Sequence, residues 1–144
     1  MFRTRYAGLS LAGAARERYL DDGLYIPKDH AGHFLTHLVT TRPFRVLDLR
    51  TEANLDALDV DDQISTSHHL PVQTACHELA DAARRWWEDL DGLVYRSRTT
   101  PMKSVNIAFF SLDGLKSTST RLSECGAELD DLVLHHQFTV GFDY

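Results

Sequence analysis

The chain has 144 residues, with 15 Lys and Arg against 21 Asp and Glu, and its formal net charge is −6. A chain of about this length buries roughly 68–70% of its unfolded surface, and we expect one domain over residues 1–144. Hydrophobic residues make up 43% and charged residues 25%, as in globular proteins, which excludes wholesale disorder. The acidic balance argues against direct nucleic-acid binding, because such binding depends on cations that neutralise phosphates.

The sequence carries no signal for export or membrane insertion. No apolar run reaches the roughly 18 residues of a membrane-spanning helix, and residues 1–5 lack the apolar stretch of a signal peptide. Two cysteines, Cys76 and Cys125, are too few for a disulfide framework, and we expect packed or solvated thiols. These features predict a cytoplasmic protein.

The first third of the chain predicts a strand, a helix and a second, weaker helix. Residues 2–9 form a short apolar run, and residues 11–20 show helical spacing after Ser10, a typical N-cap. Gly23 follows the expected end of that helix, where glycine is common. The weaker helix is expected over residues 29–38.

The rest of the chain mixes strands and helices, which predicts a mixed α/β fold. Residues 44–49 alternate as in a strand, which we expect to be internal, and residues 72–90 carry an apolar helical stripe. Trp86 lies on that stripe and is expected to anchor the core, whereas the exposure of Trp87 is left open. The remaining expected elements are strands at 93–97, 104–110 and 138–142 and a helix at 129–136.

Common catalytic and metal-binding motifs are missing from the sequence. Residues 8–13 are rich in glycine but fit neither the dinucleotide fingerprint nor the P-loop, and there is no nucleophile elbow. His30, His33 and His37 have the spacing of one helical face, and such imidazoles can bind zinc. Surface or partly buried histidines are the better interpretation, and we expect no metal site, with a zinc-binding domain as an alternative.

Three polar residues lie inside otherwise apolar elements. Glu17 is in the middle of the first helix, Ser97 ends the strand at 93–97, and Asn106 interrupts the strand at 104–110. Each pattern alone is more typical of a structural residue than of a site.

In the same order along the chain, five segments resemble the motifs of the RES family, which comprises toxins of bacterial toxin–antitoxin pairs. The strongest is residues 91–98, similar to the family's strand with its motif serine, here Ser97. The others are Tyr6 and Glu17 eleven residues apart, the strand at 46–49, the helix at 73–80 and the strand at 104–110. One departure is the motif arginine, which the family carries before the tyrosine. The chain resembles a member that is short at its N-terminus.

The resemblance implies an ADP-ribosyltransferase-like fold, with mixed sheets and flanking helices, that takes NAD as a substrate rather than a cofactor. The family breaks the bond between nicotinamide and ribose, either by hydrolysis, by phosphorolysis with phosphate as co-substrate, or by transfer of ADP-ribose to a protein. A carboxylate stabilises the positive charge that develops on the ribose, and Glu17 is the candidate. The Ser97 hydroxyl is the candidate to bind the nicotinamide amide or a phosphate.

The resemblance also implies binding residues and a partner. Tyr6 offers a ring to stack on nicotinamide, Arg3 or Arg5 is the candidate for the pyrophosphate, and Asn106 is expected to orient a neighbour. The expected partner is an Xre-like helix-turn-helix antitoxin that covers the active site and supplies any DNA contact. An alternative is a shortened RES-like domain that binds its antitoxin without turnover.

Overall fold

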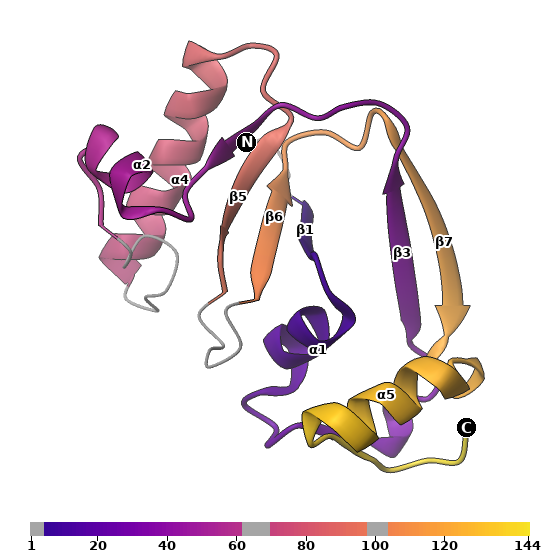
Figure 1. Ribbon diagram of the computed structural model, residues 1–144. Coiled ribbons are helices and arrows are strands. Elements are labelled where there is room, and N and C mark those ends of the chain that lie inside the picture. Colours follow the sequence, from indigo (N-terminus) through magenta and orange to yellow (C-terminus); the bar gives the residue numbers. More distant parts are fainter. Residues whose placement is uncertain (1–4, 62–69, 98–103) are drawn as a thin grey trace. The chain divides into compact units, whose positions relative to one another are not determined.

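The computed structural model describes residues 5–61, 70–97 and 104–144 and divides the chain into two compact units. Unit 1 consists of Met1–Leu9 and Pro43–Asp113, and unit 2 consists of Ser10–Arg42 and Gly114–Tyr144 (Figure 1). Each unit is described below by itself. The single domain expected over residues 1–144 stays a prediction.

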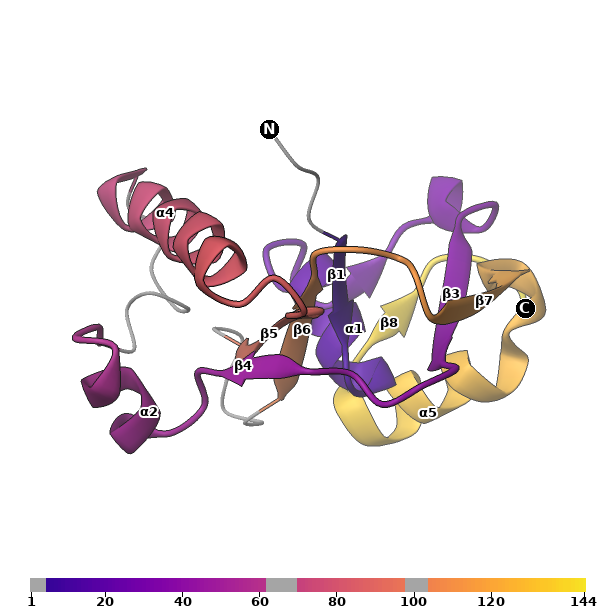
Figure 2. The same cartoon turned by 90° about the horizontal axis from the view of Figure 1, so that it is seen from above.

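Unit 1 is built on a four-stranded mixed sheet with the strand order β1-β6-β5-β4, which Figure 2 shows from above. Its strands are β1 (Arg5–Gly8), β4 (Val46–Asp48), β5 (Gly92–Arg96) and β6 (Val105–Phe109). Strand β6 pairs antiparallel with both β1 and β5, whereas β4 runs parallel to β5. The mixed α/β class is therefore confirmed.

The prediction that the strand near 44–49 is internal is wrong. Strand β4 lies at the end of the sheet and pairs only with β5 among the described strands. Leu47 and Leu49 nevertheless pack into the apolar core of unit 1. Alternating apolar residues report that the faces of a strand are covered, and they do not report how many of its edges are paired.

Two helices accompany this sheet in the described part of unit 1, and one of them corrects a predicted core residue. They are α2 (Glu52–Ala57) and α4 (Leu70–Trp86). The buried core of unit 1 comprises Leu49, Leu55, Ala83, Leu93, Ala108 and Phe110. Ala83 is completely buried, but Trp86, three residues later, is 64% exposed, so the prediction of a core anchor is wrong. The helix ends at Trp86, one turn beyond its last fully buried residue.

Unit 2 combines two helices with two separate pairs of strands. The helices are α1 (Leu11–Tyr19) and α5 (Gly126–His136), and two short 3₁₀ turns span Lys28–His30 and Leu122–Glu124. Strand β2 (Tyr25–Ile26) pairs parallel with β8 (Thr139–Val140), and β3 (Phe34–Thr40) pairs antiparallel with β7 (Leu115–Arg121). The predicted first helix is confirmed, and its N-cap Ser10 accepts a hydrogen bond from the Gly13 amide at 3.1 Å.

Helix α1 is anchored to α5 by both apolar and polar contacts. Ala12 and Tyr19 join the buried core of unit 2, which also contains Ile26, Cys125, Leu129, Leu132 and Phe138. Arg16 is buried on the same side of the helix and donates from Nη2 to the His136 carbonyl oxygen at 3.2 Å. That carbonyl belongs to the last turn of α5, where a cation is favoured by the helix dipole.

Both cysteines, Cys76 and Cys125, carry thiol groups in the structure. Cys125 is buried, its thiol donates to the Arg121 carbonyl oxygen at 3.2 Å, and burial raises its pKa. Within the described part of the chain there is no disulfide, and no helix there is long and apolar enough to cross a membrane.

The helix predicted over residues 29–38 is wrong. The chain there forms a single 3₁₀ turn at Lys28–His30 and then enters β3 at Phe34. Strand β3 finds its partner in β7, about eighty positions later in the sequence, over seven residue pairs. Thr36, Val39 and Thr40 are β-branched, and such residues suit a strand. The spacing of the histidines, which is that of one helical face, is not a property of this segment's structure.

Asp91 ties the start of β5 to the start of β4, and Gly92 brings β5 close to β6. The Asp91 carboxylate is buried and accepts a hydrogen bond from the Arg45 amide at 2.8 Å, while the Asp91 amide donates to the Arg45 carbonyl oxygen at 2.8 Å. A Cβ atom on Gly92 would collide with the Ala108 carbonyl oxygen on β6, so only glycine allows β5 to approach β6 this closely.

We expect Asp91→Ala to lower the free energy of unfolding by about 1–3 kcal/mol, because it leaves the Arg45 amide without its carboxylate partner in a buried place. Urea unfolding followed by circular dichroism measures this. Asp89→Ala is the control, because Asp89 forms an exposed ion pair with Arg45, and the loss of such a pair should cost about 0–1 kcal/mol. Equal losses in the two variants would contradict the role given to Asp91.

Candidate functional site

The register of the unit 1 sheet brings three of the predicted site residues onto one face. Tyr6 on β1 lies opposite Ala108 on β6, and Asn106, two residues earlier on β6, lies opposite Tyr95 on β5. The Ser97 amide donates to the Ser104 carbonyl oxygen at 2.8 Å, which extends the same ladder. Because side chains alternate along a strand, Tyr6, Asn106 and Ser97 point to the same side of the sheet.

These three side chains differ in their access to solvent. Tyr6 is 66% exposed, Asn106 is 5% exposed and Ser97 is completely buried. Ala108 and Leu93 lie on the same face and pack into the core of unit 1, so a ligand could reach this face only beside the exposed Tyr6 ring. The Ser104 hydroxyl is also buried and has no hydrogen-bond partner within the described ranges.

Four strand ends meet at one end of the sheet, where Asp48, Asn106 and Ser97 lie. Strands β1, β4 and β5 end at this side and β6 begins there, as their registers require. Asp48 ends β4, and Arg50 forms a two-pronged ion pair with it, with Nε to Oδ1 and Nη2 to Oδ2 both at 2.8 Å. In sheets with parallel strands, ligands commonly bind beyond the carboxyl ends. Asp48 was not predicted as a site residue; the available signal was its place at the end of an apolar strand.

The arginine candidates are less well placed. Arg5 lies opposite Phe109, one position out of step with Tyr6, and its side chain leaves β1 on the other face. Arg3 lies outside the described residues. Arg5 therefore does not join the group formed by Tyr6, Asn106 and Ser97.

Glu17 belongs to unit 2. It lies in the second half of α1, is half-buried, and neighbours Arg16, through which the helix is fixed to α5. The chain passes from β1 in unit 1 to α1 in unit 2 through Leu9 and Ser10. Apart from Arg5, the predicted site residues with described positions thus fall into two groups. Tyr6, Asn106 and Ser97 belong to the sheet of unit 1, and Glu17 belongs to helix α1 of unit 2.

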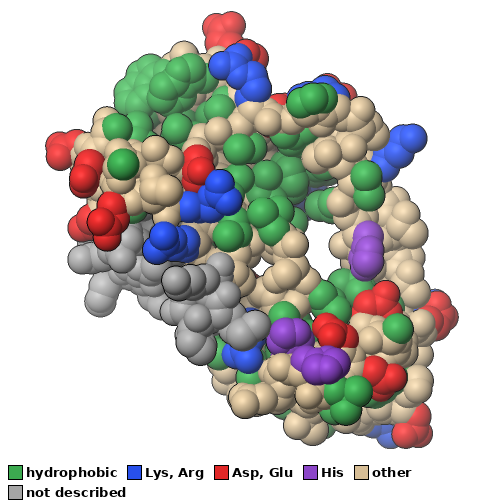
Figure 3. Space-filling model, viewed as in Figure 1, with side chains coloured by type: hydrophobic (Ala, Val, Ile, Leu, Met, Phe, Trp, Pro, Cys, Tyr) green, Lys and Arg blue, Asp and Glu red, His purple; other side chains and the backbone are tan. Residues whose placement is uncertain are grey.

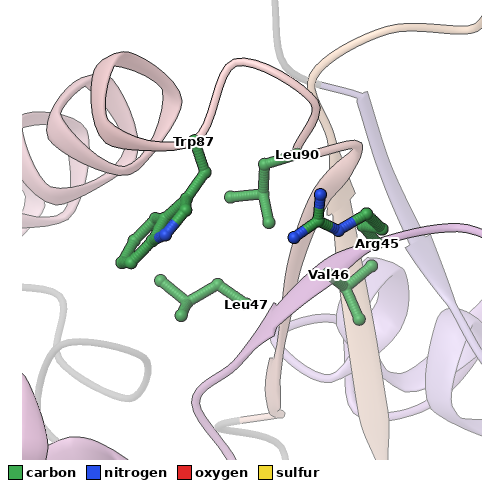
Figure 4. A pocket seen from close by; sticks show the side chains of 5 residues that line it. All are labelled: Arg45, Val46, Leu47, Trp87 and Leu90. Carbon is green, nitrogen blue, oxygen red and sulfur yellow. The ribbon is translucent and has the colours of Figure 1, made fainter.

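An open hollow of about 360 Å³ lies elsewhere in unit 1 and is shown in Figure 4. Its lining residues are Arg45, Val46, Leu47, Trp87 and Leu90. It sits at the start of β4, next to the start of β5, whereas Ser97 follows the end of β5, roughly 16 Å further along the strand direction. Figure 3 shows hydrophobic side chains gathered over the adjoining end of α4, where both tryptophans lie. The hollow is therefore separate from Ser97.

The histidines do not form the helical face that their spacing suggested. The rings of His30 and His33 lie 4.0 Å apart, and the Tyr19 hydroxyl contacts His30 Nδ1 at 3.0 Å, but His37 is on β3. No group of three or more His, Cys, Asp or Glu side chains in the described segments could hold a metal ion.

A family model described as "RES domain" matches residues 1–124. The chain belongs to the RES-domain family. No curated protein and no solved structure matches it. The resemblance drawn from the sequence motifs is therefore confirmed, and the matched part of this RES domain includes every predicted site residue. The roles of those residues stay predictions.

Arg50 holds the pKa of Asp48 below its ordinary value of 3.8, chiefly through its side-chain hydrogen bonds. The pair therefore stabilises the folded state fully above that ordinary value, and the stabilisation is lost as the pH falls through the lower folded pKa. Arg50→Ala should raise the pKa of Asp48 towards 3.8, which a carboxyl NMR titration measures.

Arg45→Ala is the matched control for this titration, because Arg45 pairs with Asp89. It should leave the Asp48 titration unchanged. A pKa of Asp48 that stays the same without Arg50 would show that the ion pair does not form in solution.

Proposed function

We propose that this RES domain is an NAD-consuming toxin of a bacterial toxin–antitoxin pair and that it cleaves the bond between nicotinamide and ribose. The observation that carries the proposal is the family match over residues 1–124. The common face of Tyr6, Asn106 and Ser97 supports it, because the sheet brings residues far apart in the sequence onto one side.

Departure of nicotinamide leaves a ribose with oxocarbenium character. A carboxylate beside that ribose lowers the barrier by stabilising the developing positive charge. We assign this role to Glu17, whose helix is held rigidly at Arg16 and Tyr19. A fixed carboxylate needs no reorganisation when the charge develops.

The exposed ring of Tyr6 is assigned to stacking on nicotinamide. Of the two arginine candidates for the pyrophosphate, Arg3 is preferred, because Arg5 leaves β1 on the opposite face. Ser97 and Asn106 are enclosed and so are assigned as positioning residues that keep the ends of β5 and β6 in place. Water, phosphate or a protein side chain could accept the ADP-ribose, and analysis of the products distinguishes glycohydrolase, phosphorylase and transferase activity.

A second candidate function is a domain that binds its Xre-like helix-turn-helix antitoxin without turnover. One observation favours it. Arg5 leaves β1 on the face opposite Tyr6, so it does not supply the arginine of the family motif to the group that contains Tyr6. Binding of NAD in calorimetry, together with unchanged NAD after long incubation, would support this second function over the first.

Glu17→Gln should slow nicotinamide release about 10²–10³-fold, because the amide cannot stabilise positive charge as a carboxylate does. The measurement is chromatography of nicotinamide after incubation with NAD, with and without phosphate. Glu128→Gln is the control, since Glu128 is a half-buried glutamate on α5 in the same unit. Release that is equally fast in the Glu17 variant and the unmodified chain would remove Glu17 from the mechanism.

Ser97→Ala should lower kcat/KM about tenfold. This is the effect of losing one hydrogen bond whose free energy lies near the upper end of the usual range for hydrogen bonds. Separate values of kcat and KM, together with Tm, distinguish positioning of the substrate from general loosening of the fold. Ser104→Ala is the matched control, because Ser104 is the buried partner of Ser97 across the ladder. The same kinetic change in both variants would indicate a purely structural role for Ser97.

A further inference from the structure

The pair formed by β3 and β7 is a two-stranded ribbon with exposed outer edges. Figure 1 shows the two strands side by side, and they pair over seven residues. No other described strand pairs with the outer edge of either. Two-stranded ribbons are at most marginally stable alone, and an open edge presents backbone groups that can pair with another strand.

The hydrogen-bond pattern shows which amides of β7 point outward. The Leu122 amide donates to the His33 carbonyl oxygen at 2.8 Å, and the Thr41 amide donates to that of Gly114 at 2.8 Å. In an antiparallel ladder, every second residue of a strand forms backbone hydrogen bonds to the partner strand. The bonds of the Leu122 and Thr41 amides show that the backbone of Thr118 on β7 bonds to β3, whereas the residues directly before and after it do not. The backbone groups of Ser117 and Ser119 therefore face away from β3.

The side chains of β7 leave this edge accessible. Six of its seven residues are exposed, and four consecutive ones, residues 117–120, are serine or threonine. Small hydroxyl side chains do not block a strand that approaches along the edge. Only Leu115 at its start is partly buried.

The charge of the ribbon is opposite to that of the chain. Residues 30–42 and 114–123 contain no Asp or Glu, although the chain as a whole carries a net charge of −6. Lys116 and Arg121 lie near the two ends of β7, and both are exposed. A strand with carboxylates near its ends would meet a cation at each end of β7.

We propose that the outer edge of β7 binds an extended, acidic segment of a partner protein by strand addition. Backbone hydrogen bonds to Ser117 and Ser119 would supply affinity, and Lys116 and Arg121 would select for acidic side chains. This inference does not depend on NAD cleavage, because it concerns another surface and another kind of ligand.

Two other occupants of this edge fit the charges less well. Pairing of β7 with β7 of a second copy would gather the lysine and arginine of both chains in one sheet without a carboxylate, which costs free energy. A nucleic-acid duplex would find two cations on β7, and the net negative charge of the chain would repel its phosphates.

The test uses a short synthetic peptide that alternates valine and threonine and carries glutamate near both ends. It is titrated into the ¹⁵N-labelled full chain, with a second peptide that has lysine in place of glutamate as the control. The acidic peptide should shift the amide signals of Ser117 and Ser119 and slow their hydrogen exchange. The lysine peptide should bind at least about tenfold more weakly, a difference that 1 M salt removes.

Ser119→Pro isolates the backbone contribution. Proline removes an outward-facing N–H and leaves the bonds between β3 and β7 in place, so the acidic peptide should bind about tenfold more weakly. Ser119→Ala is the matched control, because both variants lose the hydroxyl contact with Thr36 at 2.8 Å but only proline loses the amide. The double variant Lys116→Glu, Arg121→Glu should prefer the lysine peptide.

Several results would overturn the proposal. They are equal binding of the two peptides, unchanged binding by Ser119→Pro, signal shifts produced by a DNA duplex instead of the acidic peptide, and dimerisation that protects the same amides. A hydrogen-exchange profile in which the Ser119→Pro variant keeps the β3–β7 ladder shows that the variant is folded.

Discussion

The register of β6 between β1 and β5 is the constraint on which unit 1 depends. Each pair of this ladder determines which side chains share a face, and a shift of one residue would exchange the two faces. Gly92 permits the close approach of β5 to β6, and the Asp91 carboxylate ties β4 to the same assembly. With this register, Tyr6, Asn106 and Ser97 share a face; with any odd shift they would not.

The two units have separate apolar cores, and the predicted site residues are distributed between them. The sheet of unit 1 carries the aromatic and hydroxyl candidates, and α1 of unit 2 carries the candidate carboxylate. The rigidity of α1 comes from its own unit, through the buried Arg16 and the last turn of α5. The enclosed Ser97 and the exposed Tyr6 indicate that residues on one face can serve different purposes, one in holding the strands and one in meeting a ligand.

Surface chemistry separates three regions of the chain. Polar strand ends gather at one end of the unit 1 sheet, an open hollow lies at the start of β4, and a basic ribbon with an open edge lies in unit 2. An acidic protein can carry such a ribbon because charges interact over about a Debye length, so the local composition decides which ligands are attracted.

The sequence by itself determined the family, the mixed α/β class and the elements with strong local signals. Ser10 caps α1, because capping depends on a few adjacent residues, and Asp91 and Gly92 mark the place where the chain enters β5. Only the tertiary structure decided that Trp86 is exposed, that β4 is an edge strand, and that residues 34–40 form a strand rather than a helix. It also decided that Arg5 and Tyr6 face opposite sides. These outcomes depend on partners distant in the sequence, and local periodicity carries no information about which distant segment covers a face or pairs with an edge.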